Sequence, residues 1–187
     1  NFWVYIPAYM NLFVSAMLIL VLADNLLLMF LGWEGVGICS YLLVGFWYQD
    51  PANGAAARKA FIVTRIGDTS MALGLFLLVA ELGTLNILDV AEIAREKWEV
   101  GGTLPTIACA LILGGGLGKS AQLPLQTWLP DAMAGPTPCS ALIHAATMVT
   151  AGVYLVCLLS PIYEYAPVAA GMVTLIGAVT ALYAATV

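Results

Sequence analysis

Long apolar runs, each close to a membrane-spanning length and separated by short polar turns, limit this chain to few folds. A helix of about 20 mostly apolar residues crosses the hydrocarbon core of a bilayer. About six such segments fit the sequence, at 2–23, 25–48, 55–80, 104–134, 137–160 and 163–187. Only 9% of residues are charged, whereas soluble domains carry roughly 25%. We therefore expect an all-α, polytopic transmembrane helix bundle that forms a single domain over residues 1–187.

The segment 85–100 differs from these runs because it is amphipathic. Leu88, Ala91 and Ala94 are opposed by acidic and basic side chains, a pattern that predicts a helix outside the hydrocarbon core or along the membrane surface. Arg58 and Lys59 are expected in the short connection before the third apolar segment, and basic connections face the cytoplasm. The acidic connection at 81–99 is then expected on the opposite side.

The sequence argues against nucleotide, nucleic-acid and metal sites. The run "GGGLGKS" at 114–120 lacks the first glycine of a phosphate-binding loop, because Leu113 stands there, and no strand pattern precedes it. The six Lys and Arg side chains are too few for a basic nucleic-acid surface. The four cysteines are isolated in apolar segments and are predicted to be free buried thiols. We expect no cofactor and no metal in this chain, and no nucleic-acid partner.

Ionisable residues within the apolar runs are the strongest indication of function. A charge at the centre of a spanning helix costs at least ~2.5–3.5 kcal/mol, so it is a functional hypothesis by default. With a rise of about 1.5 Å per residue, four segments each place one ionisable group at similar depth: Glu34, Asp68, Lys119 and His144. Such a row suggests a line for protons parallel to the membrane plane. Arg65 can pair with Asp68 at i,i+3.

The fourth apolar segment, 104–134, is expected to be interrupted. It would be about 46 Å long if fully helical, too long for a core of ~30 Å without tilt or a break. Pro124 removes a backbone hydrogen bond, which predicts an unwound stretch at "QLPLQ", directly after Lys119. Interrupted helices at mid-membrane mark ion pathways. One small and polar face of the next segment is predicted to carry Ser140, His144, Thr147 and Ala151.

A structural interpretation competes with each functional one. Buried ion pairs also serve packing and specificity, and a lone buried histidine is often a satisfied core residue. Asp24, in a turn, is expected to cap a helix. The features with a purely structural alternative are the pair Glu34–Lys119, the pair Arg65–Asp68, His144, the glycines at 114–118, and the tryptophans Trp33, Trp47 and Trp128.

Three stretches carry a resemblance to a known family: "LADNLLLMFLGWEGVGICSYLLVGFWY" at 22–48, "KAFIVTRIGD" at 59–68 and "GKSAQLPLQTWLPDAMAGPTPCSALIHAATMVTAGVYL" at 118–155. They resemble the largest antiporter-like membrane subunit of respiratory complex I, the NADH–quinone oxidoreductase. Members are much longer than this chain. The resemblance therefore implies an internal segment, namely the first of two inverted repeats, with one discontinuous helix.

The resemblance also implies roles for particular residues. Glu34 and Lys119 correspond to the family's pumping pair, and His144 to the residue that links Lys119 toward the second repeat. Asp68 and Arg65 correspond to a supporting pair beside the glutamate. In this interpretation Glu34 stabilises protonated Lys119, and its withdrawal lets the proton pass through water toward His144.

The resemblance implies a proton-translocating subunit of a complex whose quinone reduction takes place elsewhere. NADH, FMN, iron–sulfur clusters and quinone are expected in partner subunits. The expected partners are other membrane subunits of complex I, especially a neighbouring antiporter-like subunit, and membrane lipid. The expected location is a bacterial inner membrane, with the chain as a multi-pass integral membrane protein.

Two other functions stay open at this point. The large subunits of Mrp-type Na⁺/H⁺ antiporters share the "KSAQ", "WLP" and "PTP" stretches, although "GWEGVGICSYLLVGFWY" favours complex I. The alternative of another class is a structural membrane scaffold, in which static buried ion pairs only hold helices together.

Overall fold

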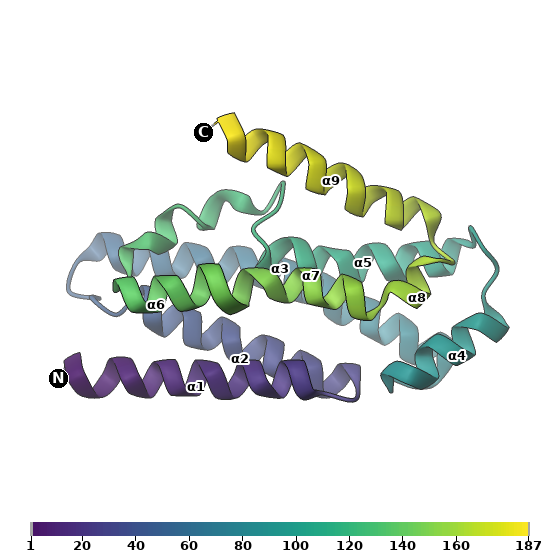
Figure 1. The fold of residues 1–187 in the computed structure, drawn as a ribbon, viewed down its shortest axis with the longest axis horizontal. Coiled ribbons are helices and arrows are strands. Elements are labelled where there is room, and N and C mark those ends of the chain that lie inside the picture. The colour runs from purple at the N-terminus through teal and green to yellow at the C-terminus, as the bar shows by residue number, and fades with distance from the viewer. Residues whose placement is uncertain (1, 187) are drawn as a thin grey trace.

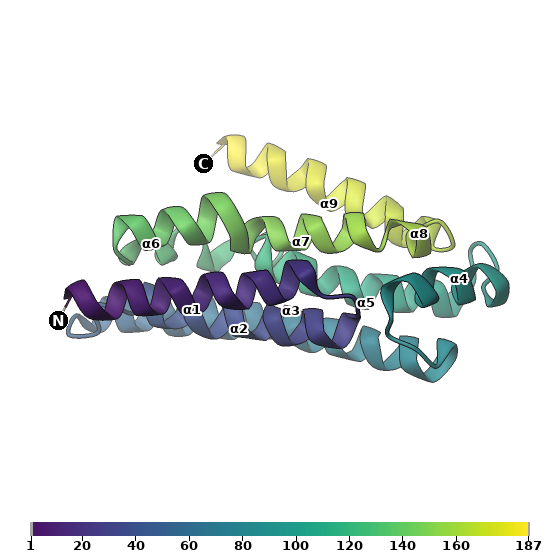
Figure 2. The same ribbon diagram turned by 60° about the horizontal axis from the view of Figure 1, so that its bottom comes forward.

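The long helices of the structure run roughly along one long axis, with the C-terminal helix inclined to the others, as Figure 1 and Figure 2 show from two directions. This computed structural model describes the backbone of residues 2–186, and their side chains except those of Phe2, Trp3 and residues 144–146. The α-helices are α1 (Phe2–Leu22), α2 (Leu26–Val44), α3 (Pro51–Leu82), α4 (Ile87–Lys97), α5 (Thr103–Lys119), α6 (Thr137–Ala141), α7 (Met148–Leu158), α8 (Ser160–Tyr163) and α9 (Pro167–Thr186). Two short 3₁₀ turns, η1 (Gln126–Trp128) and η2 (Asp131–Ala134), and one π-helical stretch, η3 (Leu142–Thr147), lie between α5 and α7.

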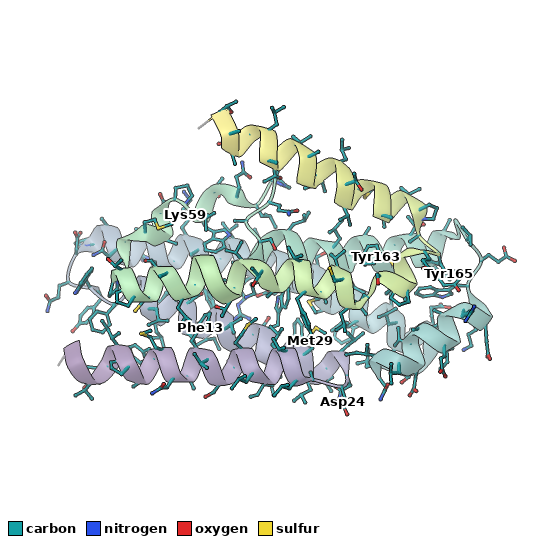
Figure 3. The ribbon with its side chains drawn as sticks, viewed as in Figure 1. Phe13, Asp24, Met29, Lys59, Tyr163 and Tyr165 are labelled. Carbon is teal, nitrogen blue, oxygen red and sulfur yellow. The ribbon has the colours of Figure 1, made fainter. Side chains whose placement is uncertain are left out.

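The predicted all-α membrane bundle is confirmed. Among the described residues, α1, α2, α3 and α9 are long and apolar enough to cross a membrane, and α5 and α7 are shorter apolar helices. Each of the expected apolar segments therefore overlaps one of these helices. Phe13 of α1 and Met29 of α2 are fully buried and point into the bundle (Figure 3).

The turn between α1 and α2 is capped differently from the prediction. Asn25, and not Asp24, is the N-cap of α2, because its side-chain oxygen accepts the Leu28 N–H at 2.8 Å. Asp24 instead accepts a hydrogen bond of 2.9 Å from the side-chain amide of Asn25. The backbone of this turn also pairs with the start of α4, through an isolated bridge between Asn25 and Asn86.

The third helix begins earlier than predicted. Residues 49–54 read as a turn in the sequence, yet α3 starts at Pro51, with Asp50 as its N-cap. Proline is well suited to the first helical position, where its missing N–H is no loss. Consequently Arg58 and Lys59 lie on the helix and not in a connection. The preceding helix, α2, ends at Val44 and not near residue 48.

The amphipathic helix α4 has its apolar face in a different register from the prediction. Val90 and Ala94 are fully buried, whereas Leu88 is 76% exposed. Asn86 caps the helix by accepting the N–H groups of Leu88 and Asp89. The stripe that faces the protein therefore runs from the partly buried Ile87 to Val90 and Ala94, at i, i+3 and i+7.

The glycines at 114–118 serve close helix packing. A Cβ at Gly67 of α3 would lie 2.7 Å from the carbonyl oxygen of Gly114 in α5, so any side chain there would force the two helices apart. Gly118 also faces α3, while Gly116 faces Gly152 of α7. This near contact of backbones brings Lys119, the last residue of α5, directly against α3.

The cysteines are free, and Cys39, Cys109 and Cys139 are buried as predicted. Cys157 is exposed, contrary to the prediction, because it lies on the outer side of α7.

Candidate functional site

Lys119 lies at the end of an interrupted helix, as the sequence predicted. α5 ends at this residue, and the chain then runs without regular helix until η1 begins at Gln126. In Figure 1, α5 stops part way along the bundle, before the chain turns away toward α6. The Lys119 side chain is fully buried. A cation in the last turn of a helix is favoured by the helix dipole, but a buried ammonium also needs a counter-charge.

The broken end of α5 is held by hydrogen bonds from outside the helix. The indole N–H of Trp128 donates to the carbonyl oxygen of Gly118 at 3.0 Å, and the Ser120 hydroxyl donates to the carbonyl of Val149 in α7 at 2.7 Å. The Leu123 N–H donates to the Thr180 hydroxyl of α9 at 3.2 Å. The contacts of Gly118 and Leu123 satisfy backbone groups that an interrupted helix leaves without partners, and the contact of Ser120 ties the break to α7. The break is thus fixed by α7, η1 and α9.

Asp68 of α3 is the counter-charge of Lys119. The Lys119 Nζ lies 3.2 Å from Asp68 Oδ2, and the two side chains are 0% and 2% exposed. The two groups therefore form a buried ion pair. Arg65 Nε lies 3.9 Å from the same oxygen, so the predicted i,i+3 pair is present as well. Both cations of the site therefore face one oxygen of Asp68.

Glu34 of α2 pairs with Arg65, and this differs from the expected direct pair with Lys119. The Arg65 guanidinium forms a salt bridge with Glu34, and these side chains are 26% and 22% exposed. A guanidinium has five N–H donors in a planar fork, so it can contact both carboxylates. The Arg65 guanidinium also lies over the Phe61 ring, 4.5 Å from its centroid. The charges alternate in sign from the half-buried Glu34 to the fully buried Lys119.

Gly37 explains how closely α2 approaches Lys119. A Cβ at this position would lie only 2.8 Å from Lys119 Nζ and 3.4 Å from the Arg65 Nη2. Glycine therefore leaves the space that the two cationic side chains occupy between α2, α3 and α5. In this way the fold brings together four of the predicted site residues: Glu34, Arg65, Asp68 and Lys119.

The side chain of His144, the fifth predicted site residue, lies outside the described residues. Its backbone belongs to η3, where the helix widens to π geometry between α6 and α7. Such π segments occur frequently at functional sites. The widening changes the register of the predicted polar face. The Thr147 hydroxyl donates to Leu142 five residues earlier at 2.8 Å, and the Ser140 hydroxyl to Gly135 at 3.5 Å.

Trp33 is a site residue that the sequence interpretation assigned only to packing. It is fully buried on α2, and its indole N–H donates to Asp68 Oδ1 at 2.7 Å. Its position directly before Glu34 in "GWEG" was the available signal, since a buried indole N–H generally requires an acceptor. The sequence could not identify Asp68 as that acceptor, because it lies on another helix.

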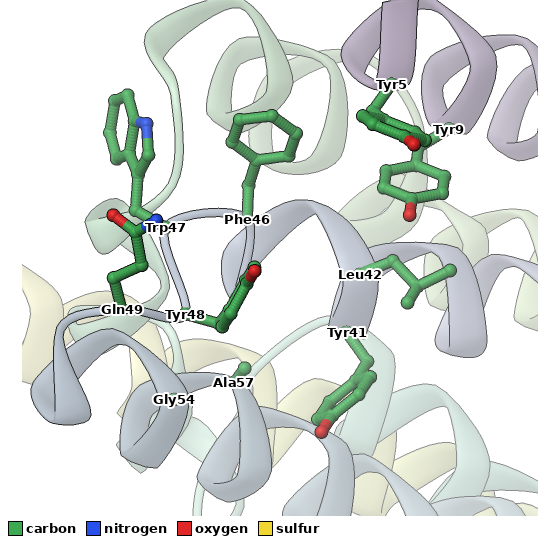
Figure 4. Close-up of a pocket in the computed structure, with 11 residues that line it drawn as sticks. Tyr5, Tyr9, Tyr41, Leu42, Phe46, Trp47, Tyr48, Gln49, Gly54 and Ala57 are labelled. Carbon is green, nitrogen blue, oxygen red and sulfur yellow. The ribbon is translucent and has the colours of Figure 1, made fainter. Parts of the chain in front are cut away.

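A well-formed cavity lies away from these charges. It has a volume of about 730 Å³ and lies between the start of α1, the end of α2 and the start of α3 (Figure 4). Aromatic side chains dominate its lining, with no Asp, Glu, Lys, Arg or His among the lining residues: Tyr5, Tyr9, Tyr41, Phe46, Trp47 and Tyr48. Aromatic rings of this kind gather at membrane–water interfaces. The buried ion pairs, and not this cavity, form the candidate site.

The fold and the site together define a class of protein. It is a multi-pass helical membrane protein in which a discontinuous helix ends at a buried lysine, and neighbouring helices supply acidic and basic partners.

The chain belongs to the family described as the NADH:quinone oxidoreductase/Mrp antiporter transmembrane family, whose model matches residues 23–187. NADH-quinone oxidoreductase subunit L of Escherichia coli strain K12 is 60% identical over 177 residues, which are 95% of this chain and 29% of the relative. The proteins of the same name from Pseudomonas aeruginosa and Mycobacterium tuberculosis strain H37Rv are 59% and 52% identical, over 95% of the chain in each case. The chain thus spans about 29% of the length of these relatives, as the predicted internal segment requires.

A solved structure supports the fold. The match is to a chain in the structure of the membrane-bound sulfane sulfur reductase, an archaeal respiratory membrane complex. The TM-score is 0.74, with 23% sequence identity, over 84% of this chain and 32% of the other. At this identity the match concerns the fold alone.

Proposed function

We propose that the chain is the part of an NADH–quinone oxidoreductase membrane subunit that carries one proton-translocation site, with Lys119 as the proton carrier. The observation that carries the proposal is the fully buried Lys119, ion-paired with Asp68 at the end of a broken helix. A charge buried within a membrane bundle is costly without a partner, and such a residue is by default a candidate for function. The high identity to subunit L relatives supports this function over the Mrp-type antiporter.

The arrangement suggests how a proton could be held and released. Burial disfavours an ammonium group and an adjacent carboxylate favours it. The protonation of Lys119 therefore depends on the position and charge of Asp68. Arg65 contacts both Asp68 and Glu34, so a change at the more exposed Glu34 reaches Lys119 through Arg65 and Asp68. The onward acceptor is proposed to be His144, by way of water.

Under this proposal the redox chemistry belongs to other chains. NADH, FMN, iron–sulfur clusters and quinone would be bound by partner subunits. The lateral neighbours would be other membrane subunits, including a second antiporter-like subunit, together with lipid. The location would be the bacterial inner membrane, as expected for a multi-pass protein of this family.

The experiment uses the complete complex in sealed membrane vesicles and compares two driving forces. NADH should drive proton uptake that a protonophore abolishes, and the rate per assembled complex should fall when Lys119 is replaced by alanine. A sodium gradient that drives equal proton movement without NADH would favour the Mrp-type antiporter. Full NADH-driven uptake in Lys119→Ala would favour the structural scaffold and contradict the proposal.

A further inference from the structure

Trp33 makes a short hydrogen bond to Asp68, the buried acid of the site. Its indole N–H donates to Asp68 Oδ1 at 2.7 Å, below the usual range centre of about 2.9–3.0 Å for N–H···O bonds. Hydrogen bonds to ionised acceptors are shorter and stronger than neutral ones. Trp33 is 0% exposed and Asp68 is 2% exposed. Water therefore does not compete with the indole at this oxygen.

The two oxygens of Asp68 have separate partners. Oδ1 accepts from Trp33, while Oδ2 faces Lys119 at 3.2 Å and Arg65 at 3.9 Å. The terminal torsion of an aspartate is broad and intrinsically poorly defined. A donor fixed on one oxygen sets the carboxylate plane, and with it the direction of the other oxygen. The indole thus determines how Asp68 presents its charge to Lys119.

An indole suits this position because it donates a hydrogen bond and accepts none. It cannot take the proton that the site transfers. Trp33 and Glu34 are consecutive on α2, and they contact the two members of the α3 pair, Asp68 and Arg65. The Trp33 ring also lies under the Lys119 ammonium, whose Nζ is 5.9 Å from the ring centroid. Helix α2 therefore reaches the acid, the guanidinium and the lysine with two adjacent side chains.

We propose that Trp33 is a positioning residue for proton transfer, which holds the Asp68 carboxylate oriented toward Lys119 through its indole N–H. The inference rests on the proposed function of Lys119 and adds a residue to it. Trp33 does not carry the proton, and its effect passes through Asp68.

The test is a double-mutant cycle in the complete complex, with NADH-driven proton uptake normalised to the amount of assembled complex. Trp33→Phe keeps an aromatic ring and removes the N–H. We expect uptake to fall about tenfold, as for the loss of a hydrogen bond to a charged group. In an Asp68→Ala background, Trp33→Phe should change uptake by less than about twofold, because the effect depends on Asp68. The matched control is Trp47→Phe, at a tryptophan that is 46% exposed outside the site, which should leave uptake unchanged.

A spectroscopic measurement separates positioning from packing. The difference between the ultraviolet resonance Raman spectra of wild type and Trp33→Phe isolates the signal of the Trp33 indole. This signal should indicate a strong N–H hydrogen bond. The same indole should have a weak N–H hydrogen bond in Asp68→Ala. Full uptake in Trp33→Phe, equal losses in both backgrounds, or an unchanged indole band in Asp68→Ala would each overturn the inference. If Lys119→Ala also retained full uptake, the proposed function itself would fail; if only Trp33→Phe did, the inference alone would fail.

Discussion

Two lysine–aspartate pairs in this chain have the same chemistry and opposite environments. The Nζ of Lys59 lies 2.6 Å from Asp131 Oδ2, but these side chains are 45% and 44% exposed. The Nζ of Lys119 lies farther from its aspartate, at 3.2 Å from Asp68 Oδ2, with 0% and 2% exposure. Exposed ion pairs contribute about 0–1 kcal/mol, because water and salt screen them. Breaking a buried pair costs about 3–5 kcal/mol, because an uncompensated charge is left behind. The solvent exposure of a pair, and not the distance between its charged atoms, therefore determines how much the loss of the pair is expected to cost.

The largest expected effect is that of Lys119→Ala. This change removes the proposed proton carrier, and positioned proton-transfer groups contribute factors of about 10²–10⁴ to a rate. We expect NADH-driven proton uptake per assembled complex to fall by at least about a hundredfold. Uptake in sealed vesicles, divided by the amount of complex on a native gel, measures the effect. Loss of uptake only in proportion to loss of assembly would assign Lys119 to packing.

The second effect distinguishes the two acids. Asp68→Asn removes the charge that faces Lys119, whereas Glu34→Gln removes a charge that pairs with Arg65. The first change should therefore reduce proton uptake more, by about tenfold against about threefold, because the nearer and more buried charge has the stronger influence. The same vesicle measurement on both variants tests the order. A larger loss in Glu34→Gln would show that Glu34, as the family resemblance implied, is the direct partner of Lys119.

A third effect concerns the packing that brings Lys119 against α3. Gly67→Ala places a Cβ 2.7 Å from the Gly114 carbonyl oxygen, and overpacking of this kind costs about 1–3 kcal/mol. The thermal midpoint of the complex, or the assembled fraction on a native gel, should fall. Gly54→Ala in the same helix is the matched control, because a Cβ there meets nothing within 4 Å. Equal behaviour of the two variants would show that the α3–α5 approach does not limit stability.

The smallest expected effect is that of Lys59→Ala at the exposed pair. It should change the stability of the complex by about 1 kcal/mol or less and leave proton uptake unchanged. Uptake and the thermal midpoint at low and high salt provide the check. A loss of uptake comparable with that in Lys119→Ala would remove the contrast between the two pairs.

The parts of the fold that depend on local chemistry could be predicted from the sequence. The number of apolar segments follows from the lengths of the apolar runs and the polar turns between them, and the break after Lys119 follows from Pro124 and the excess length of the segment. The predictions were wrong where two neighbouring residues could each take the same place in the structure, as a helix cap or as part of a buried stripe. The buried stripe of α4 begins at Ile87 and not at Leu88, one residue away, and the cap of α2 is Asn25 and not Asp24.

The partners within the site could not be predicted, because they depend on contacts between helices. Glu34 and Lys119 have complementary charges, but the near contact of α3 and α5 at Gly67 places Asp68 beside Lys119 instead. Arg65 then pairs with Glu34. The hydrogen bond from Trp33 to Asp68 joins residues 35 positions apart in the sequence. No local pattern encodes such a contact.

The measurement that tests the central claim most directly is NADH-driven proton uptake by complexes that carry Lys119→Arg. Arginine keeps the positive charge opposite Asp68, but its guanidinium stays protonated at all accessible pH values and cannot release a proton. If Lys119 carries the proton, the variant should assemble and uptake should fall nearly as far as in Lys119→Ala. Normal assembly with full proton uptake would show that only the charge at this position matters, and would contradict the role of Lys119 as a proton carrier.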